Sequence, residues 1–467
     1  MTADTATTPD RRAAPSAPSE SDGRYVTSHY IEGGVTDALA ARHAVHETAV
    51  DKYSRYYLVS MLINSGINTL RSPHADARLP LSGPLLEALQ FFQEPARLEA
   101  FPGHRPHAPE DGALLRTLIE NKFLFPASVD QDRCFNLLNV EIDTNTVCNQ
   151  ACTFCPVSID PRKRDDISEA MFDDILEQVA SLGQNPAASI SIYLAAYNEI
   201  TLDKRYPSFA RKIREHGFQH TVISNGSNLR PQLVDTLLDL GIDEFVLNVP
   251  ALDEETYFAL RGTRDINRIV EHIDHLATTP ARVTIIVHGV AGRDHDRNYR
   301  AMKRRFRDTS VTVTMGRTMD RAGNLDNEYR STTKRASMHG CMNDGSRLIN
   351  WIHVSAQGEC FICPMDYYMK HKVGDLRRQS IQEVMQGDDV AEFRRYLHGL
   401  EEAPEQFICR SCMVCLPASW KETSTRDATP RGLYRSGLQA RLRQKVAATQ
   451  VFAPLYLGRA IPGIGRG

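Results

Sequence analysis

The chain has 467 residues, which is too long for one ordinary domain and enough for two or three. Its residues are 42% hydrophobic and 24% charged, as is typical of a soluble globular protein, and its net charge of -3 gives no general basic field that would attract nucleic acid. The sequence has no apolar run of about 18 residues, which a membrane-spanning helix needs. We therefore expect a cytoplasmic protein that binds neither nucleic acid nor membrane.

The N-terminal part predicts a tail followed by a small domain. Residues 1–24 are rich in Ala, Thr, Pro and Ser and lack the apolar core of a signal peptide, so we expect a disordered tail. Residues 25–130 follow, and within them the segment 56–70 alternates as a strand does. The apolar residues of 82–92 and 111–125 recur at helical spacing. A strand segment followed by two helices predicts a small separate α+β domain.

Residues 131–335 show a regular alternation of strand and helix patterns. Six segments have strand character, at 137–142, 189–195, 220–225, 244–249, 282–290 and 310–316. Helical patterns lie between them, and the first is bounded by Ser168 as its N-cap and by Gly183 at its end. Repeated strand and helix units imply a parallel sheet with helices outside it, either a doubly wound sheet or a curved partial barrel. In both architectures, ligands bind where the strands end.

Residues 336–422 break this alternation and form a cysteine-rich unit. Their segment 348–364 predicts a hairpin that turns at Gly358, and residues 380–400 predict one helix. Residues 423–467 form a basic C-terminal tail. The chain therefore predicts a small N-terminal domain, an α/β core and a cysteine-rich C-terminal unit, followed by this tail.

All ten cysteines but Cys134 are clustered. Three lie in one loop, Cys148, Cys152 and Cys155, and six lie further on, Cys341, Cys360, Cys363, Cys409, Cys412 and Cys415. Reducing compartments disfavour disulfides, so clusters at these spacings indicate metal or iron–sulfur ligands. The three-cysteine loop follows the first strand of the alternating region, where catalytic loops lie. Cubane clusters normally take four thiolates, so three leave one iron open for a reactant. A structural zinc site with a fourth ligand elsewhere is the alternative.

The C-x3-C-x2-C loop, with the aromatic Phe154 before its third cysteine, resembles the motif of the radical S-adenosylmethionine enzymes. The strand-ending "YNEIT" resembles the family's Gly-Gly-Glu-Pro element, with Glu199 at the glutamate position and departures at Asn198 and Ile200. "SNGSN" and "LNVPALDEETYFALRG" are similar to further strand-end elements. The resemblance covers about residues 135–320 and implies a partial (β/α)6 TIM-like barrel.

The resemblance also implies the cofactors. Cys148, Cys152 and Cys155 would bind a catalytic [4Fe-4S] cluster whose open iron holds the amino and carboxylate groups of S-adenosylmethionine. An electron from a reductant such as flavodoxin or ferredoxin would then cleave the cofactor to a 5′-deoxyadenosyl radical, which abstracts hydrogen from the substrate. The cofactor-binding residues implied are Phe154, Asn198, Glu199, which accepts from the methionine ammonium, and Ser224 and Asn248, which contact ribose or carboxylate.

The C-terminal cysteines resemble the twitch and SPASM domains that some of these enzymes append. Cys341, Cys360, Cys409 and Cys412 are the set implied for one auxiliary [4Fe-4S] cluster, with Cys415 as a substitute for Cys409 or Cys412. Cys363 has no role in this assignment, and a zinc knuckle is the alternative. An auxiliary cluster can take an electron from the substrate radical, which favours a net oxidation or bond formation.

The N-terminal region resembles the winged-helix peptide-recognition domains of ribosomal-peptide maturases, which implies a precursor peptide as a partner. The preferred hypothesis is therefore the oxidative modification of a ribosomal peptide in natural-product biosynthesis. A small-molecule sugar or aminocyclitol dehydrogenase or dehydratase is the second hypothesis, favoured by a single twitch-like cluster. A non-catalytic iron–sulfur protein is the third, and the intact cofactor constellation argues against it.

Overall fold

The computed structural model describes residues 23–33, 69–80, 82–101, 109–290, 292–325, 334–335, 338–341, 347–412 and 415–417. Three predicted features lie largely outside these residues: the N-terminal tail, the strand expected over 56–70 and the basic tail 423–467. Within the described ranges, no helix is long and apolar enough to cross a membrane.

The N-terminal region contains two small antiparallel sheets and two helices. One sheet has the order β5 (Ala96–Arg97), β1 (Arg24–Thr27), β6 (Leu124–Pro126), and the other is β2 (Glu32–Gly33), β3 (Thr69–Ser72), β4 (Ala77–Pro80). The helices are α3 (Gly83–Phe91) and α4 (Pro109–Glu120), where the apolar spacing predicts them, and η1 (Leu98–Ala100) is a short turn. Leu89, Phe92, Leu118 and Phe123 are buried in one cluster, so this region has a hydrophobic core of its own.

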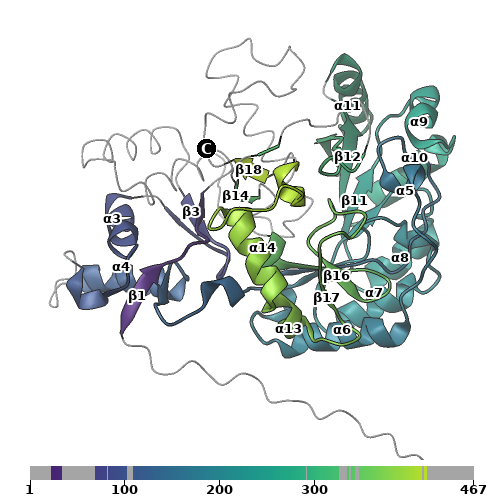
Figure 1. The fold of residues 1–467 in the computed structure, drawn as a ribbon. Coiled ribbons are helices and arrows are strands. Elements are labelled where there is room, and N and C mark those ends of the chain that lie inside the picture. Colours follow the sequence, from purple (N-terminus) through teal and green to yellow (C-terminus); the bar gives the residue numbers. More distant parts are fainter. Residues whose placement is uncertain are drawn as a thin grey trace, which may run out of the picture.

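The middle of the chain forms the expected partial barrel (Figure 1). Its strands are β7 (Asn139–Ile142), β8 (Ser191–Tyr193), β9 (Gln219–His220), β10 (Val222–Ser224), β11 (Glu244–Asn248), β12 (Arg282–Gly289) and β13 (Thr312–Arg317). Every pair of neighbours in these two series, β7 to β9 and β10 to β13, is parallel. β9 and β10 are two parts of one predicted strand, interrupted at Thr221. The six-strand alternation seen in the sequence is therefore confirmed.

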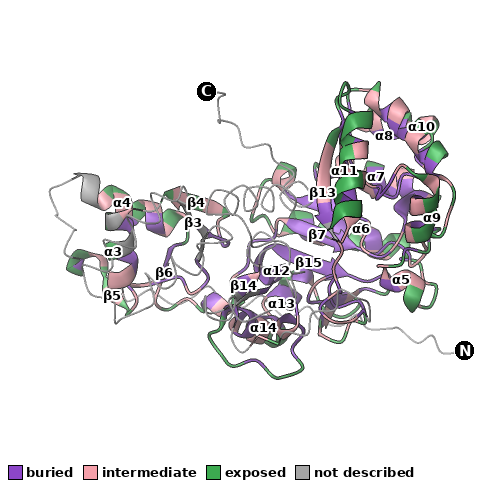
Figure 2. Ribbon diagram, turned by 90° about the horizontal axis from the view of Figure 1, so that it is seen from above, coloured by how far each residue is buried: buried purple, intermediate pink, exposed green. Residues whose placement is uncertain are grey.

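Helices cover the outer side of these strands. They are α5 (Pro156–Ile159), α6 (Glu169–Ser181), α7 (Tyr206–Glu215), α8 (Pro231–Asp239), α9 (Glu254–Arg261), α10 (Ile266–Ala277) and α11 (Arg293–Arg305), with the turns η2 (Gln131–Arg133), η3 (Ala187–Ser189) and η4 (Ile200–Leu202). α6 begins at the predicted cap, where Ser168 Oγ accepts from Met171 N at 3.1 Å. Figure 2 shows that the strands inside the barrel are buried and that the surrounding helices expose their outer faces.

The C-terminal unit has the elements β14 (Met338–Cys341), α12 (Arg347–Asn350), β15 (Trp351–Val354), β16 (Glu359–Phe361), β17 (Lys372–Asp375), α13 (Ile381–Met385), α14 (Asp388–His398), η5 (Ile408–Arg410) and β18 (Cys415–Pro417). The predicted hairpin is present and turns at Gly358, whose φ is +83°. This hairpin is not separate from the barrel, because β15 pairs in parallel with β7 and continues its sheet. In Figures 1 and 2, β14 and α14 lie between the N-terminal region and the barrel.

The prediction of one helix over residues 380–400 is wrong, because the segment forms α13 and α14 with a break at Gly387. Ser380 begins α13 with a capping box that includes Glu383. Gly387 is the N-cap residue of α14 and has extended backbone dihedrals. The continuous apolar spacing hid this break, since a helix restart two residues later returns the apolar side chains to the same core.

Arg394 of α14 forms hydrogen bonds with two other segments of the chain, α12 and η2. Its side chain is completely buried, and burial lowers the pKa of its guanidinium to about 10. Nε and Nη2 donate to Leu348 O at 2.9 and 2.7 Å, and Nη1 donates to Asp132 O at 2.6 Å. Because these backbone acceptors belong to α12 and η2, one cation joins the C-terminal unit to the start of the barrel.

We expect Arg394→Lys to lower the free energy of unfolding by about 2–4 kcal/mol, since an ammonium cannot reproduce the three buried hydrogen bonds. Chemical denaturation of the reconstituted protein measures the change. The control is Arg395→Lys, because Arg395 forms ion pairs with Asp132 and Glu401 from a side chain that is 34% exposed. That control should change stability by less than about 1 kcal/mol. Equal losses in both variants would contradict the anchoring role of Arg394.

Candidate active site

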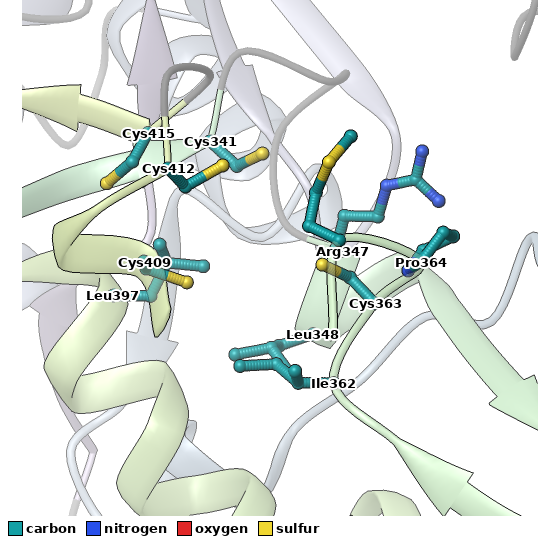
Figure 3. A pocket seen from close by; sticks show the side chains of 11 residues that line it. Cys341, Arg347, Leu348, Ile362, Cys363, Pro364, Leu397, Cys409, Cys412 and Cys415 are labelled. Carbon is teal, nitrogen blue, oxygen red and sulfur yellow. The ribbon is translucent and has the colours of Figure 1, made fainter. Parts of the chain in front are cut away.

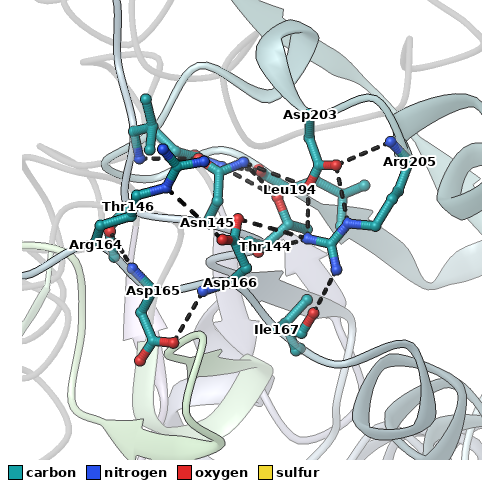
Figure 4. A network of polar contacts seen from close by, with 12 residues as sticks. Thr144, Asn145, Thr146, Arg164, Asp165, Asp166, Ile167, Leu194, Asp203 and Arg205 are labelled. Carbon is teal, nitrogen blue, oxygen red and sulfur yellow. Dashed lines mark hydrogen bonds and ion pairs between the residues drawn. The ribbon is translucent and has the colours of Figure 1, made fainter.

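The backbone that enters the three-cysteine loop is held by a polar network at the end of β7 (Figure 4). Thr144 O accepts from Ile167 N at 2.9 Å, and Thr146 N donates to Asp165 O at 3.1 Å. The Thr146 hydroxyl also accepts from Asp165 N at 3.0 Å, and Arg205 donates to Ile167 O at 2.6 Å. The chain immediately before the first cysteine is therefore fixed against a neighbouring segment rather than left as a free loop.

The C-terminal end of α9 accepts hydrogen bonds from the backbone of the three-cysteine loop. Ala151 N donates to Arg261 O at 2.9 Å, and Thr153 N donates to Leu260 O at 3.1 Å. These contacts use carbonyl groups that a helix end leaves without intrahelical partners. Gly262 follows with a φ of +70°, and a Cβ at this position would lie 2.9 Å from the Ala151 Cβ. Glycine is therefore required by both the backbone conformation and the close approach of the loop.

The structure brings the three loop cysteines together. Cys155 N donates to Cys152 O at 3.1 Å, and Arg261 Nη1 donates to the Cys152 sulfur at 3.0 Å. Burial raises the pKa of Cys148 to about 12, and the charges of Glu199, Cys152 and Cys155 act in the same direction. The site therefore resists thiolate formation unless a cation binds, and the irons of a cluster supply that positive charge. Three thiols with this environment fit an iron–sulfur cluster.

Arg261 is a site residue that the sequence analysis did not assign. It is buried, and its Nη2 donates to the carbonyl oxygen and the Oδ1 of Asn248 at 2.8 and 2.6 Å. Its guanidinium also lies 5.1 Å from the centroid of the Phe154 ring. One cation thus connects Cys152, Phe154 and Asn248, three of the predicted site residues. The sequence feature that could have identified Arg261 is its position as the last residue of α9, directly before Gly262.

Glu199 is the N-cap residue of η4, Ser224 is the last residue of β10, and their side chains form a hydrogen bond. Glu199 Oε1 accepts from Thr201 Oγ1 at 2.6 Å and from Ser224 Oγ at 2.8 Å, and its Oε2 accepts from Asn225 N at 2.7 Å. Burial raises the pKa of this carboxyl group, and these hydrogen bonds oppose that effect. Oε2 can accept one more bond, as the predicted contact with a methionine ammonium requires. The Ser224 proton is already donated, so a ribose contact would use Ser224 as an acceptor.

Asn198, the departure from the family pattern, offers a second open acceptor. Its Nδ2 donates to Leu194 O at 3.1 Å and to Thr144 Oγ1 at 3.3 Å. Its Oδ1 is buried and has no hydrogen-bond partner within the described part of the chain. A buried acceptor without a partner costs free energy, so this atom is suited to a ligand donor beside Glu199.

A second cysteine set lines one cavity in the C-terminal unit (Figure 3). The cysteines are Cys341, Cys363, Cys409, Cys412 and Cys415, and Arg347, Leu348 and Ile362 are among the other residues that line it. Burial raises the pKa of Cys409, and the charges of the other four cysteines raise it further. No group of three His, Cys, Asp or Glu side chains in the described ranges is arranged to hold a single metal ion. The thiols surround a volume, as the ligands of different irons in one cluster do.

Cys360 was predicted to be a ligand of this set, but it does not line the cavity, whereas Cys363 does. Cys360 is in β16 and is buried in the hydrophobic core between the barrel strands and the outer helices. Cys363 follows after β16 ends, and burial raises the pKa of its thiol to about 12, with Cys341 acting in the same direction. In Figure 3 the sulfur of Cys363 points into the cavity toward Cys409, whereas the sulfur of Cys415 points away. Cys363 therefore joins Cys341, Cys409 and Cys412 as a candidate ligand, and Cys415, which lines the same cavity, remains the alternative.

Tyr197 lies between the two cysteine sets. Its hydroxyl donates to Pro364 O, next to Cys363, and the Arg321 guanidinium lies 5.4 Å from its ring centroid. Burial raises the pKa of Tyr197, while the Arg321 charge lowers it and the charges of Cys155 and Cys363 raise it. Arg321 also lowers the pKa of Cys155, which burial raises. One tyrosine and one arginine therefore connect the two sites through the barrel.

Two protein families match separate parts of the chain. Residues 142–304 match the radical SAM superfamily, and residues 341–413 match an iron–sulfur cluster-binding domain called SPASM. Enzymes of this superfamily use a [4Fe-4S] cluster with S-adenosylmethionine and require a reductant, and the SPASM domain adds auxiliary clusters. The two matched ranges contain the two cysteine sets.

One similar protein is the S-adenosyl-L-methionine-dependent 2-deoxy-scyllo-inosamine dehydrogenase of Niallia circulans, 24% identical over 284 residues, which are 60% of this chain and 94% of that protein. A solved structure of BtrN in complex with AdoMet and 2-DOIA is 22% identical with a TM-score of 0.41, covering 60% of this chain and 92% of that one. A solved structure of Streptococcus suis SuiB bound to precursor peptide SuiA is 14% identical with a TM-score of 0.48. The match covers 74% of this chain and 96% of that one.

The assignment of Cys363 can be tested by iron content. Anaerobic reconstitution should give about eight irons per chain for two complete clusters, and Cys363→Ala should lose about four of them. Cys360→Ala is the matched control and should keep all eight, because its thiol lies in the hydrophobic core. Loss of iron from the Cys360 variant with retention in the Cys363 variant would restore the assignment that the sequence suggested.

Proposed function

We propose that this chain, a radical SAM enzyme with a C-terminal iron–sulfur cluster-binding domain, dehydrogenates a small hydroxylated molecule of the sugar or aminocyclitol class. The observation that carries the proposal is the second cysteine set, which could hold a redox-active cluster connected to the loop cysteines through Tyr197. A dehydrogenation needs both a hydrogen-atom acceptor and an electron acceptor. Two clusters on opposite sides of one substrate would provide the places for both.

The loop residues would bind and orient the first group. When bound and reduced, the cluster and S-adenosylmethionine supply a 5′-deoxyadenosyl radical that removes hydrogen from a C–H bond. Cys148, Cys152 and Cys155 would each hold an iron, and the Arg261 hydrogen bond would stabilise the Cys152 thiolate. The open acceptors on Glu199 and Asn198 would bind the methionine ammonium.

The C-terminal residues would hold the electron acceptor. Cys341, Cys363, Cys409 and Cys412 supply the four thiolates of a closed site, so this cluster needs no ligand from the substrate. The cavity also contains Arg347, whose charge lowers the pKa of Cys363 against the effect of burial. A positive side chain beside the thiolates would favour the cluster state that has gained an electron. A flavodoxin or ferredoxin is the proposed external reductant for the loop cluster.

The substrate class rests on the Niallia circulans dehydrogenase, which matches this chain over 94% of its own length. Its match supports an alcohol oxidation in an aminocyclitol-like molecule. Oxidative modification of a ribosomal peptide remains the second candidate, because only 60% of this chain is covered by that match. β4 is an edge strand that pairs with β3 alone among the described strands, and such an edge can receive a peptide as an added strand.

We expect the reduced, reconstituted protein to convert S-adenosylmethionine and 2-deoxy-scyllo-inosamine into equal amounts of 5′-deoxyadenosine and the corresponding ketone. Mass spectrometry of both products is the measurement. A Cys148/Cys152/Cys155→Ala variant should form neither, because the loop cluster cannot be held. If that variant still makes 5′-deoxyadenosine, the assignment of the catalytic loop fails. If the wild-type protein forms 5′-deoxyadenosine but oxidises no aminocyclitol or sugar in a panel, the peptide candidate gains support.

The role of the second cysteine set has a separate test. Cys363→Ala should still cleave S-adenosylmethionine, since its cavity is distinct from the loop, but should form at least about 100-fold less ketone because the electron has no acceptor. Cys360→Ala should keep both activities. Ketone formation by Cys363→Ala at the wild-type rate would show that the second site is structural and would favour a redox-neutral elimination.

A further inference from the structure

Four strands place one row of side chains on the inner face of the barrel. The pairing register puts Glu141 of β7 opposite both Tyr193 of β8 and His353 of β15, and puts His353 opposite Phe361 of β16. Side chains alternate along a strand, and the flanking residue Val140 packs into the core beneath the outer helices. Glu141 and His353 therefore face the other way, into the barrel.

Glu141 and His353 form a buried pair with unused hydrogen-bonding capacity. Glu141 is 5% exposed and His353 is 1% exposed, and Glu141 Oε1 lies 3.4 Å from His353 Nδ1. Glu141 Oε1 and both imidazole nitrogens have no hydrogen-bond partner among the residues that the structure describes. Buried polar atoms are normally satisfied, so these three atoms need a further explanation. The 3.4 Å separation is within hydrogen-bond reach, so the carboxylate and the imidazole are misaligned rather than too far apart, and long or poorly aligned contacts of this kind are common in ligand-free catalytic sites.

The imidazole ring of His353 is held in one orientation. It stacks on Trp351 with the ring centroids 5.7 Å apart and an interplanar angle of 6°, and Trp351 stacks on Tyr193 at 5.4 Å and 19°. Arg347 lies 4.2 Å over the Trp351 ring and 4.0 Å from Glu141 Oε2. With the ring fixed by stacking and Nδ1 facing the carboxylate, Nε2 is the nitrogen left for a ligand.

The pair also lies on the path between the two cysteine sets. On one side, Arg347 lines the cavity of the second set. On the other side, Asp143, two residues after Glu141, pairs with Arg162 at 3.0 Å, and this arginine lies 5.2 Å from the Tyr197 ring centroid. A substrate that reaches both sites would therefore pass along the inner face that carries Glu141 and His353.

We propose that His353 binds the reacting hydroxyl group of the substrate and accepts its proton, and that Glu141 is the positioning residue that holds the imidazole. This inference rests on the proposed dehydrogenation. It assigns the same roles that a carboxylate and an imidazole have in other proton-transfer sites, with Nδ1–H directed to the carboxylate and the Nε2 lone pair directed to a hydroxyl group.

The reaction balances with this pair in place. The hydroxyl oxygen would lose its proton to His353 Nε2, the substrate carbon would lose its hydrogen atom to the radical supplied at the loop site, and the remaining electron would go to the cluster that the second cysteine set would hold. The C–H and O–H bonds break, and a C=O double bond forms. The alcohol is oxidised by two electrons, of which one leaves with the hydrogen atom and one reduces the cluster.

The surroundings of His353 suit a proton acceptor. Burial lowers the pKa of the imidazole, the facing Glu141 carboxylate of β7 raises it, and Arg347 of α12 lowers it. The aromatic rings that contact His353 among the described residues, Trp351 of β15 and Phe361 of β16, carry no charge. Because these effects together lower the pKa of the imidazole, His353 is neutral at neutral pH and able to take a proton. Product formation should therefore fall only as acid protonates the ring.

The first experiment needs no turnover. Calorimetry with the reconstituted, unreduced holoenzyme and S-adenosylmethionine measures binding of 2-deoxy-scyllo-inosamine as the probe. His353→Asn should weaken binding about 2- to 12-fold, the range for one lost hydrogen bond. The control is His220→Asn, which replaces another buried histidine whose nitrogens already contact Tyr206 Oη and Ile192 O, and it should leave binding unchanged. Unchanged binding in His353→Asn would remove the proposed contact.

The second experiment uses the same probe with deuterium on its ring carbons. In His353→Asn, 5′-deoxyadenosine should still form and gain deuterium, but ketone should fall about 100-fold or more and recover as the pH rises. In Glu141→Gln, the acid limb of ketone formation should move to lower pH, because the carboxylate that raises the imidazole pKa is gone. Wild-type ketone yield and pH profile in both variants would overturn the inference.

These outcomes separate the inference from the proposed function. If the wild-type holoenzyme neither binds nor oxidises the probe or related polyols, the dehydrogenase proposal fails and the pair loses its role with it. If the wild type oxidises the probe and the two variants do so equally well, dehydrogenation stands and the pair is structural. Iron content and thermal unfolding of each variant check that a loss of ketone does not come from a loss of clusters or of the fold.

Discussion

The parallel pairing of β15 with β7 is the interaction on which the rest of the architecture depends. β7 begins the barrel, and without a neighbour on that side its backbone N–H and C=O groups would form an open edge. β15 satisfies that edge and brings the β15–β16 hairpin into the same sheet. Cys363 follows this hairpin and β7 leads to Cys148, so one strand pair sets the positions of both cysteine sets. The register of the same pair places Glu141 beside His353.

The loop cysteines depend on a second constraint, the end of α9. α9 supplies two carbonyl groups that accept from the loop backbone and the Arg261 side chain that donates to Cys152. Arg261 is buried among a sulfur, an amide oxygen and an aromatic face, so its charge is compensated by several weak acceptors rather than by a carboxylate. Such an arrangement leaves the arginine able to stabilise added negative charge at Cys152.

Burial and nearby charges shift the pKa values of several side chains inside the barrel. Burial raises the pKa of Asp143 to about 6, and Arg162 opposes the effect. Burial also raises the pKa values of Cys148 and Cys363, and backbone hydrogen bonds, together with Arg347 beside Cys363, oppose that effect. The interior thus combines thiols suited to metal binding with carboxylates and an imidazole that lack some of their hydrogen-bond partners. These are properties of a ligand site, and a hydrophobic core would exclude them.

Local patterns in the sequence determined the parts of this protein that depend on short spacings. The alternation of apolar segments determined six parallel strands with outer helices, Ser168 determined the start of α6, and the spacing of Cys148, Cys152 and Cys155 predicted a cluster-binding loop within the range that matches the radical SAM superfamily. Tertiary structure decided that Cys363 and not Cys360 lines the second cavity, because strand alternation turned the Cys360 thiol into the core while Cys363 follows the strand end. It also decided the break at Gly387 and the contacts that Arg261, Glu141 and His353 make. Those residues act through partners distant in the chain, and such contacts form only when strand pairing and helix packing bring separate segments together.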